Sequence, residues 1–145
     1  MYKKILLPTD GSEYAAKAEK HALFIAEASG AEIIALSVVE NSYFASLPAD
    51  ETISHVNDLL KRETEKNLDT VQEMKKEMNS DVKITLCVEE GSPGDAILNT
   101  IDKENIDLVV MGSSGRTGFS RLIMGSVAEK VVKAAKCSVL VIHEK

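Results

Sequence analysis

The chain has no tryptophan and only three Phe and three Tyr among its 145 residues. Proteins that bind single-stranded nucleic acid stack the bases on aromatic side chains, so this composition argues against such a platform. Basic residues are also in the minority, with 17 Lys and Arg against 23 Asp and Glu, and the formal net charge is −6. A net negative charge is unsuited to general binding of a phosphate backbone, so nucleic acid is not an expected partner.

Long apolar runs and cysteines are scarce as well. No run reaches the roughly 18 apolar residues of a membrane-spanning helix. Met1–Lys4 leads directly into an apolar segment, so the sequence predicts neither a membrane span nor a signal peptide. The two cysteines, Cys87 and Cys137, are typical of a reducing compartment. We therefore expect a cytoplasmic protein with no membrane partner.

Several motifs of nucleotide and metal chemistry are missing. The sequence has no Gly-x4-Gly-Lys-Ser/Thr phosphate loop, no Gly-x-Gly-x-x-Gly after the first apolar run, no His-x-Gly-His pattern and no Ser-Gly-Gly-x-Asp-Ser pattern. The histidines His21, His55 and His143 fall in three separate predicted elements. The sequence therefore predicts none of these nucleotide-binding classes and no histidine-based metal site.

What the sequence does contain is a regular alternation of apolar and amphipathic segments. Apolar residues make up 44% of the chain, which is enough for one domain over residues 1–145 to bury a core. The predicted strands are 5–7, 33–39, 82–88, 106–111 and 138–143, and the predicted helices are 13–29, 51–78, 93–104 and 126–135. This order predicts an α/β fold, with a single doubly wound five-stranded parallel sheet and helices on both faces.

Two strand orders are compatible with this alternation, and they place the ligand site differently. Ligands of open parallel sheets bind where the strand order reverses. The segments Pro8–Gly11 and Gly112–Gly125 become neighbours in the order 3-2-1-4-5 but not in 2-1-3-4-5. The receiver-type version of the second order also needs an acidic cluster and a lysine after the last strand, whereas Asp10 stands alone and Lys145 is the last residue. We therefore predict 3-2-1-4-5.

A glycine-rich segment follows the fourth predicted strand. Gly112-Ser113-Ser114-Gly115 comes directly after the strand, and Gly125-Ser126 begins the next predicted helix. Glycine lets backbone N–H groups approach an anion, and a helix N-terminus offers unpaired donors with partial positive charge. The window Gly112–Lys136 has a local charge of +4 and includes Arg116 and Arg121. The pattern is compatible with nucleotide phosphate binding and with a surface loop that contains turn glycines, and the glycines by themselves favour the loop.

The other residues near the predicted site each have two interpretations. The carboxylate of Asp10 is able to accept hydrogen bonds from ribose hydroxyls, or it forms an Asx-turn before Ser12. The Ser126 hydroxyl is an added donor for phosphate or an ordinary helix N-cap, and the two roles are compatible. Val38 and its neighbours, at the end of the second strand, are suited to apolar contact with a base.

Together, Gly-x2-Gly-x9-Gly-Ser after the fourth strand and Pro8-Thr9-Asp10 after the first resemble the universal stress protein family. The resemblance covers the whole chain, from Tyr2 to Ile142. The family has ATP-binding members and members without the glycine motif, and this sequence resembles the ATP-binding branch. Ser114 departs from the family pattern, in which His or Arg is common, so phosphate contact there would come from the backbone.

The resemblance implies a role for each site residue. Asp10 would hold the ribose, and the backbone at Val38 would meet the adenine. The residues implied to line the phosphates are Gly112, Gly115, Gly125, Ser126 and Val127, with Pro8, Thr9 and Met111 packed nearby. The expected cofactor is ATP with Mg²⁺ or Mn²⁺.

Three functions from different classes are compatible with these residues. The first is a regulatory ATP-binding protein of the stress response that reports nucleotide state to a protein partner. The second is a slow ATPase or self-phosphorylating enzyme with acceptors among Ser113, Ser114, Thr117 and Ser120, although no general base stands beside them in the sequence. The third is a flavin-binding electron carrier.

The last predicted strand also suggests an assembly. Residues 138–142 are apolar apart from Ser138, with no charge or proline, and the predicted order places them at a sheet edge. An edge of this kind pairs readily with another chain. Dimers of the resembled family commonly use this strand, so we expect a homodimer through residues 138–142.

Overall fold

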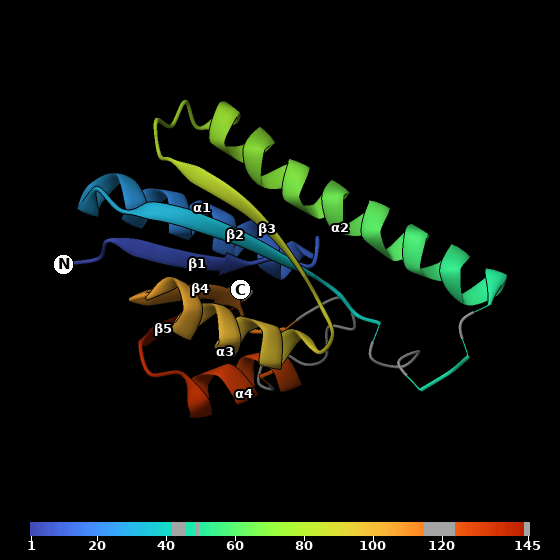
Figure 1. Cartoon of the computed structure of the whole chain (residues 1–145). Helices are drawn as coiled ribbons and strands as arrows, with labels where there is room; N and C mark the ends of the chain where they lie inside the picture. Colours follow the sequence, from blue (N-terminus) through green and yellow to red (C-terminus); the bar gives the residue numbers. More distant parts are fainter. Residues whose placement is uncertain (42–45, 49, 115–123, 144–145) are drawn as a thin grey trace.

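The computed structural model describes residues 1–41, 46–48, 50–114 and 124–143. Five strands and four helices alternate along these residues (Figure 1). Their bounds are β1 Lys4–Pro8, α1 Glu13–Ser29, β2 Glu32–Val39, α2 Glu51–Glu77, β3 Ile84–Glu90, α3 Pro93–Glu104, β4 Leu108–Gly112, α4 Ser126–Ala134 and β5 Ser138–Ile142. Each expected element is present, and its ends lie within two residues of the expected ones.

The strands form one parallel sheet in the order β3-β2-β1-β4-β5, which confirms the predicted order. In the centre of the sheet, Leu6 pairs with Ile34 of β2 on one side and with Val109 of β4 on the other. Because β1 is adjacent to β4, the segments that follow these two strands leave the sheet side by side. This is the arrangement that the predicted ligand site required.

Helices cover both faces of the sheet, α1 and α2 on one face and α3 and α4 on the other (Figure 1). Side chains of β1 alternate between the two cores: Ile5 and Leu7 face α1 and α2, and Leu6 faces α3 and α4. Four alanines on the inner face of α1 are buried, which lets this helix lie close to the sheet. They are Ala15, Ala18, Ala22 and Ala26.

Capping residues fix where α1 begins and ends. The Ser12 side chain accepts a hydrogen bond from the Ala15 backbone N–H at 3.2 Å. Gly30 ends the helix in the left-handed conformation with φ 75°, which glycine adopts without steric cost. The start of α1 is therefore set by Ser12, two residues beyond Asp10.

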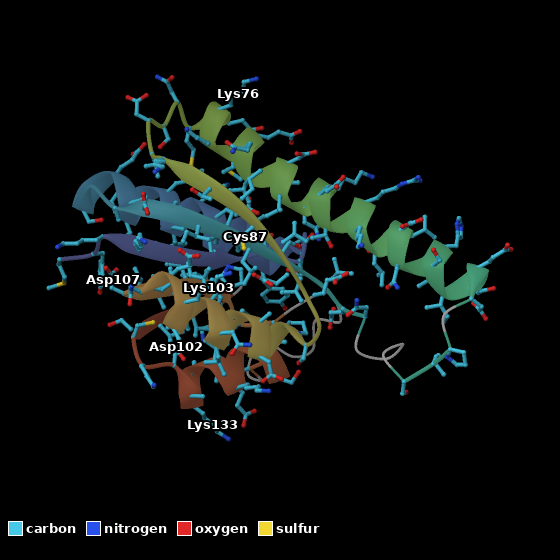
Figure 2. The ribbon with its side chains drawn as sticks, in the orientation of Figure 1. Lys76, Cys87, Asp102, Lys103, Asp107 and Lys133 are labelled. Carbon is cyan, nitrogen blue, oxygen red and sulfur yellow. The ribbon has the colours of Figure 1, made fainter. Side chains whose placement is uncertain are left out.

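The two cysteines lie on β3 and beside β5, the opposite edges of the sheet, and both are free thiols. Figure 2 labels Cys87 on β3, and its thiol has a raised pKa, mainly because burial disfavours the thiolate.

Asp107 lies at the amino end of β4, where its carboxylate accepts hydrogen bonds from the backbone N–H groups of Lys3 and Lys4. Across the described ranges, no helix is long and apolar enough to cross a membrane.

Candidate nucleotide site

A cavity of about 680 Å³ lies at the carboxyl ends of β1, β2 and β4. Its floor comes from the ends of these strands, and α2, α3 and the first turn of α4 form its walls. It contains nine of the ten predicted site residues: Pro8, Thr9, Asp10, Val38, Met111, Gly112, Gly125, Ser126 and Val127. The tenth, Gly115, lies outside the described residues, as do Arg116, Arg121, Thr117 and Ser120. The strand order thus brings together residues more than a hundred positions apart.

Short backbone hydrogen bonds fix the loops around the cavity. The N–H of Thr9 donates to the Leu36 carbonyl at 2.8 Å, which continues the β1–β2 pairing past Pro8. The N–H of Ser113 donates to the Ile142 carbonyl at 2.9 Å, and the N–H of Gly125 donates to the Ser113 carbonyl at 2.7 Å. The start of α4 is therefore tied to the end of β4.

Gly112 is required by packing in addition to any ligand role. A Cβ atom at this position would lie 2.6 Å from the Tyr14 Cβ and 2.9 Å from the Tyr14 carbonyl carbon. The backbone of α1 would have to move to admit it. The glycine motif therefore has a structural component, the close approach of α1 to β4, which the sequence pattern alone did not separate from phosphate binding.

Gly125 is the N-cap of α4, so the interpretation of Ser126 as an N-cap is wrong. Ser126 is instead the first helical residue, and no side chain at the cap position accepts from the N–H groups of the first turn. A Cβ at Gly125 would lie 3.3 Å from the Ser113 carbonyl oxygen and from the Ser114 Cα. A side chain at position 125 would therefore need the backbone of Ser113 or Ser114 to move by a few tenths of an ångström. The α4 N-terminus lines the cavity.

Asp10 performs the turn role that the sequence offered as one alternative. Its Oδ1 accepts a hydrogen bond from the Ser12 N–H at 2.9 Å, and the residue is half-buried on the cavity wall. The carboxylate is thereby held in place while it lines the cavity. The turn role and a ligand role are both compatible with this geometry.

The positive charge around α4 is partly neutralised by ion pairs. Lys130 pairs with Asp95 of α3, and the Lys133 Nζ lies 2.7 Å from Glu129 Oε1. This contact lowers the pKa of the Glu129 carboxyl and raises that of the Lys133 ammonium group. Attraction for an anion at the described part of the site thus comes mainly from the helix N-terminus.

One wall of the cavity was missed by the sequence analysis. Four residues of α2 line it: Leu60, Glu63, Thr64 and Asn67. A signal was present, because Thr64 and Asn67 interrupt an apolar helical face with groups able to form hydrogen bonds. Glu63 is half-buried.

A buried carboxyl behind the loop after β1 was also missed. Glu19 of α1 is 2% exposed, and the Thr9 Oγ1 donates to its Oε1 at 3.3 Å. Burial raises the pKa of Glu19 to about 7, against the smaller lowering effects of Thr9 and Thr70. The available signal was its position among the alanines, since Glu19 lies one turn after Ala15 on the inner face of the helix.

Comparisons with known proteins agree with this arrangement. The family model described as the universal stress protein family matches residues 1–143. Universal stress protein MJ0531 of Methanocaldococcus jannaschii is 44% identical over 144 residues, covering 99% of this chain and 84% of that protein.

Solved structures are similar over almost the full length. The structure of MJ0577, a universal stress protein of the same organism, aligns with a TM-score of 0.81 and 33% identity, covering 100% of this chain and 98% of that one. A universal stress protein in complex with cAMP aligns with a TM-score of 0.63 and 26% identity, covering 98% and 97%.

Proposed function

Because the chain belongs to the universal stress protein family, we propose that it binds ATP in the cavity at the carboxyl end of the sheet and acts as a regulatory protein of the stress response. The observation that carries the proposal is the cavity itself. A volume of about 680 Å³ suits a small-molecule ligand, and one surface combines strand ends, a helix N-terminus and four acidic residues, which are Asp10, Glu40, Glu63 and Glu129. A related structure holds an adenine nucleotide, cAMP, which supports this ligand class.

The lining suggests how the parts of ATP would be divided among the walls. Val38, Ile97 and Met124 offer apolar surface for the adenine. The carboxylate of Asp10 would accept from ribose hydroxyls, since the Ser12 N–H already holds it in position. The phosphates would lie against the first turn of α4, whose N–H groups and dipole favour anions.

The described residues include no group of three side chains suited to hold a metal ion. Mg²⁺ usually binds through substrate phosphates with one or two carboxylates. The residues fit a metal that arrives with ATP, with Asp10 as one of the carboxylates that line the cavity, better than a resident Mg²⁺ or Mn²⁺. Such a metal would neutralise phosphate charge at the α4 end of the cavity.

The proposal is tested by isothermal titration calorimetry of the purified chain with ATP and Mg²⁺, after acid release and chromatography of any nucleotide already bound. We expect saturable ATP binding and no FMN binding. Absence of binding to ATP, ADP and cAMP would refute the proposal, and a yellow protein that releases flavin would favour the electron-carrier alternative. ADP formed during the titration would indicate a slow ATPase.

We also propose a homodimer through β5, which lies at one edge of the sheet. Val139, Leu140 and Val141 of this strand are half-buried within one chain, so pairing with a second copy would cover apolar surface as well as backbone hydrogen-bonding groups. The cavity is lined by the ends of β2, β1 and β4 and by no residue of β5, so each subunit would hold its own nucleotide.

A further inference from the structure

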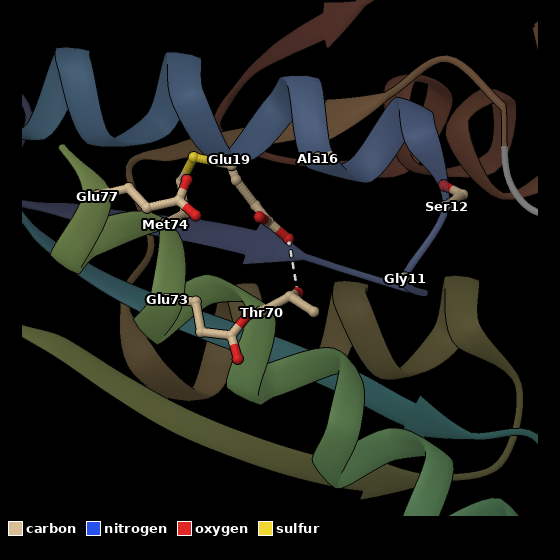
Figure 3. Close-up of a pocket in the computed structure, with 8 residues that line it drawn as sticks. All are labelled: Gly11, Ser12, Ala16, Glu19, Thr70, Glu73, Met74 and Glu77. Atoms are coloured by element: carbon tan, nitrogen blue, oxygen red, sulfur yellow. Dashed lines mark hydrogen bonds between the residues drawn. The ribbon is translucent and has the colours of Figure 1, made fainter.

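We propose that Glu19 is a positioning residue for the nucleotide site, whose carboxyl couples the loop after β1 to helix α2 and favours ATP binding when it is neutral. This inference rests on the proposed function, because it concerns regulation of the same site. Its basis is a second, smaller cavity of about 170 Å³ between α1 and α2, on the other side of that loop. Figure 3 shows this cavity with Glu19 on the α1 side and Thr70 on the α2 side.

The loop after β1 is the wall between the two cavities. Thr9 lines the nucleotide cavity, Gly11 lines the smaller one, and Ser12 lines both. The Thr9 hydroxyl accepts from the Gly11 N–H at 3.4 Å and donates to Glu19 Oε1 at 3.3 Å. Gly11 has φ 78°, in the left-handed region where glycine is favoured. A change in Glu19 therefore reaches the nucleotide cavity through one side chain, Thr9.

Glu19 has weak partners for a buried charge. The Thr70 Oγ1 lies 3.4 Å from Glu19 Oε1 and 2.6 Å from the Asn67 carbonyl oxygen, and its one proton goes mainly to the shorter bond. Both contacts to the carboxyl are longer than the usual 2.7–2.8 Å or so of a hydroxyl hydrogen bond. The ionised carboxylate would therefore lose hydration without adequate replacement.

The described residues that line the smaller cavity supply no cation to offset a charge on Glu19. From α2, Glu73 and Glu77 line the same cavity, and none of its eight described lining residues is basic. β4 and β5 carry no ionisable side chain, and Lys4 of β1 and Glu32 of β2 pair with each other at the amino end of the sheet. Asp10 in the loop is acidic as well. These surroundings agree with the pKa of about 7 that burial gives Glu19.

Ionisation of Glu19 near neutral pH therefore adds negative charge behind the loop and draws water into the smaller cavity. Both effects oppose an anionic ligand on the other side of Thr9. By linkage, bound ATP should in turn favour the protonated carboxyl. The structure thus points to ATP affinity that falls as pH rises through 7, in addition to any titration of ATP itself.

The test compares wild type with Glu19→Gln, in which the amide imitates the neutral carboxyl. Calorimetry with Mg-ATP gives the dissociation constant of each protein at pH 6 and at pH 8. At each pH the wild-type constant is divided by that of the variant, so that the titration of ATP itself cancels. We expect a ratio near one at pH 6 and a rise of roughly three- to ten-fold by pH 8. The matched control Glu73→Gln alters the same cavity without touching Thr9, and it should retain the wild-type pH dependence.

A second measurement uses wild type alone, so the inference stays testable if the variant folds poorly. ATP titrations at pH 7 in buffers of different ionisation enthalpy report the number of protons taken up on binding. We expect wild type to take up more protons than the titration of the ATP phosphates accounts for. A pH-independent ratio, or no proton uptake, with ATP bound normally would overturn the Glu19 inference alone. Absence of ATP binding in every protein at both pH values would overturn the proposed function with it.

Discussion

Replacing Ser126 with aspartate is expected to weaken ATP binding strongly while the fold persists. Ser126 is the first residue of α4, and its position lines the cavity. A carboxylate there would lie where the proposal puts the phosphates. The same charge suits the helix itself, because a negative side chain in the first turn stabilises a helix by about 0.3–1 kcal/mol.

The size of the effect follows from the geometry of a charge beside the phosphates. Two unit charges about 5 Å apart repel by about 1–3 kcal/mol for effective dielectric constants between roughly 80 and 20. A central value of about 2 kcal/mol corresponds to about 30-fold weaker binding. Ser126→Asn has nearly the same shape without the charge, so it should cost much less affinity.

The assay is calorimetry of wild type, Ser126→Asp and Ser126→Asn with Mg-ATP and with adenosine, after thermal unfolding has verified that each variant is folded. Adenosine has no phosphate, so its affinity should be equal in the aspartate and asparagine variants. Equal ATP affinity in both variants would refute the assignment of phosphates to the α4 N-terminus. Equal losses for ATP and adenosine in Ser126→Asp would indicate a distorted cavity instead of charge repulsion.

Four further predictions test separate parts of the account. Gly112→Ala should destabilise the fold by about 1–3 kcal/mol in urea unfolding, since its Cβ would lie 2.6 Å from that of Tyr14, and unchanged stability would contradict the packing role. Asp10→Ala should weaken ATP binding and reduce discrimination between ATP and 2′-deoxy-ATP in competition experiments, whereas unchanged discrimination would leave Asp10 as a turn residue. Val141→Pro should give monomers that still bind ATP; sedimentation of wild type as a monomer at micromolar concentration, or of the variant as a dimer, would exclude the β5 interface. The pKa of Glu19 is about 7 in the folded chain and 4.5 ordinarily, so the free energy of unfolding should be highest below pH 4.5 and should fall by about 3 kcal/mol as pH rises through 7. Urea unfolding of Glu19→Gln should not show this fall.

The strand order was predictable because two loops with chemical meaning had to meet. Asp10 and the Gly112 segment are far apart in sequence, and only the order that places β1 beside β4 joins their exits. Alternation of strand and helix then left little freedom for the remaining elements. The place of the candidate site was predictable for the same reason, since ligands of such sheets bind where the order reverses. Thr9, Met111 and Val127 were named only through the family resemblance.

The missed features depend on contacts that a linear pattern does not encode. The sequence does not show whether Gly112 is needed for the approach of a phosphate or for the close packing of Tyr14. Glu19 follows the helical periodicity of the buried alanines, but its burial depends on α2, which packs over it from fifty residues later in the chain. The α2 wall of the cavity was missed because the rotation of that helix against the sheet decides whether Glu63 faces solvent or the cavity.

The most direct test of the central claim is an amide nitrogen–proton NMR titration of the labelled chain with Mg-ATP, because it reports binding and location together. ATP in this cavity should cause saturable shift changes in three described segments around it: residues 9–12, residues 36–40 and residues 124–129. Lys3 and Asp107, at the opposite end of the sheet, should not change. Absence of shifts at millimolar ATP, or saturable shifts confined to residues away from the carboxyl ends of the strands, would contradict it.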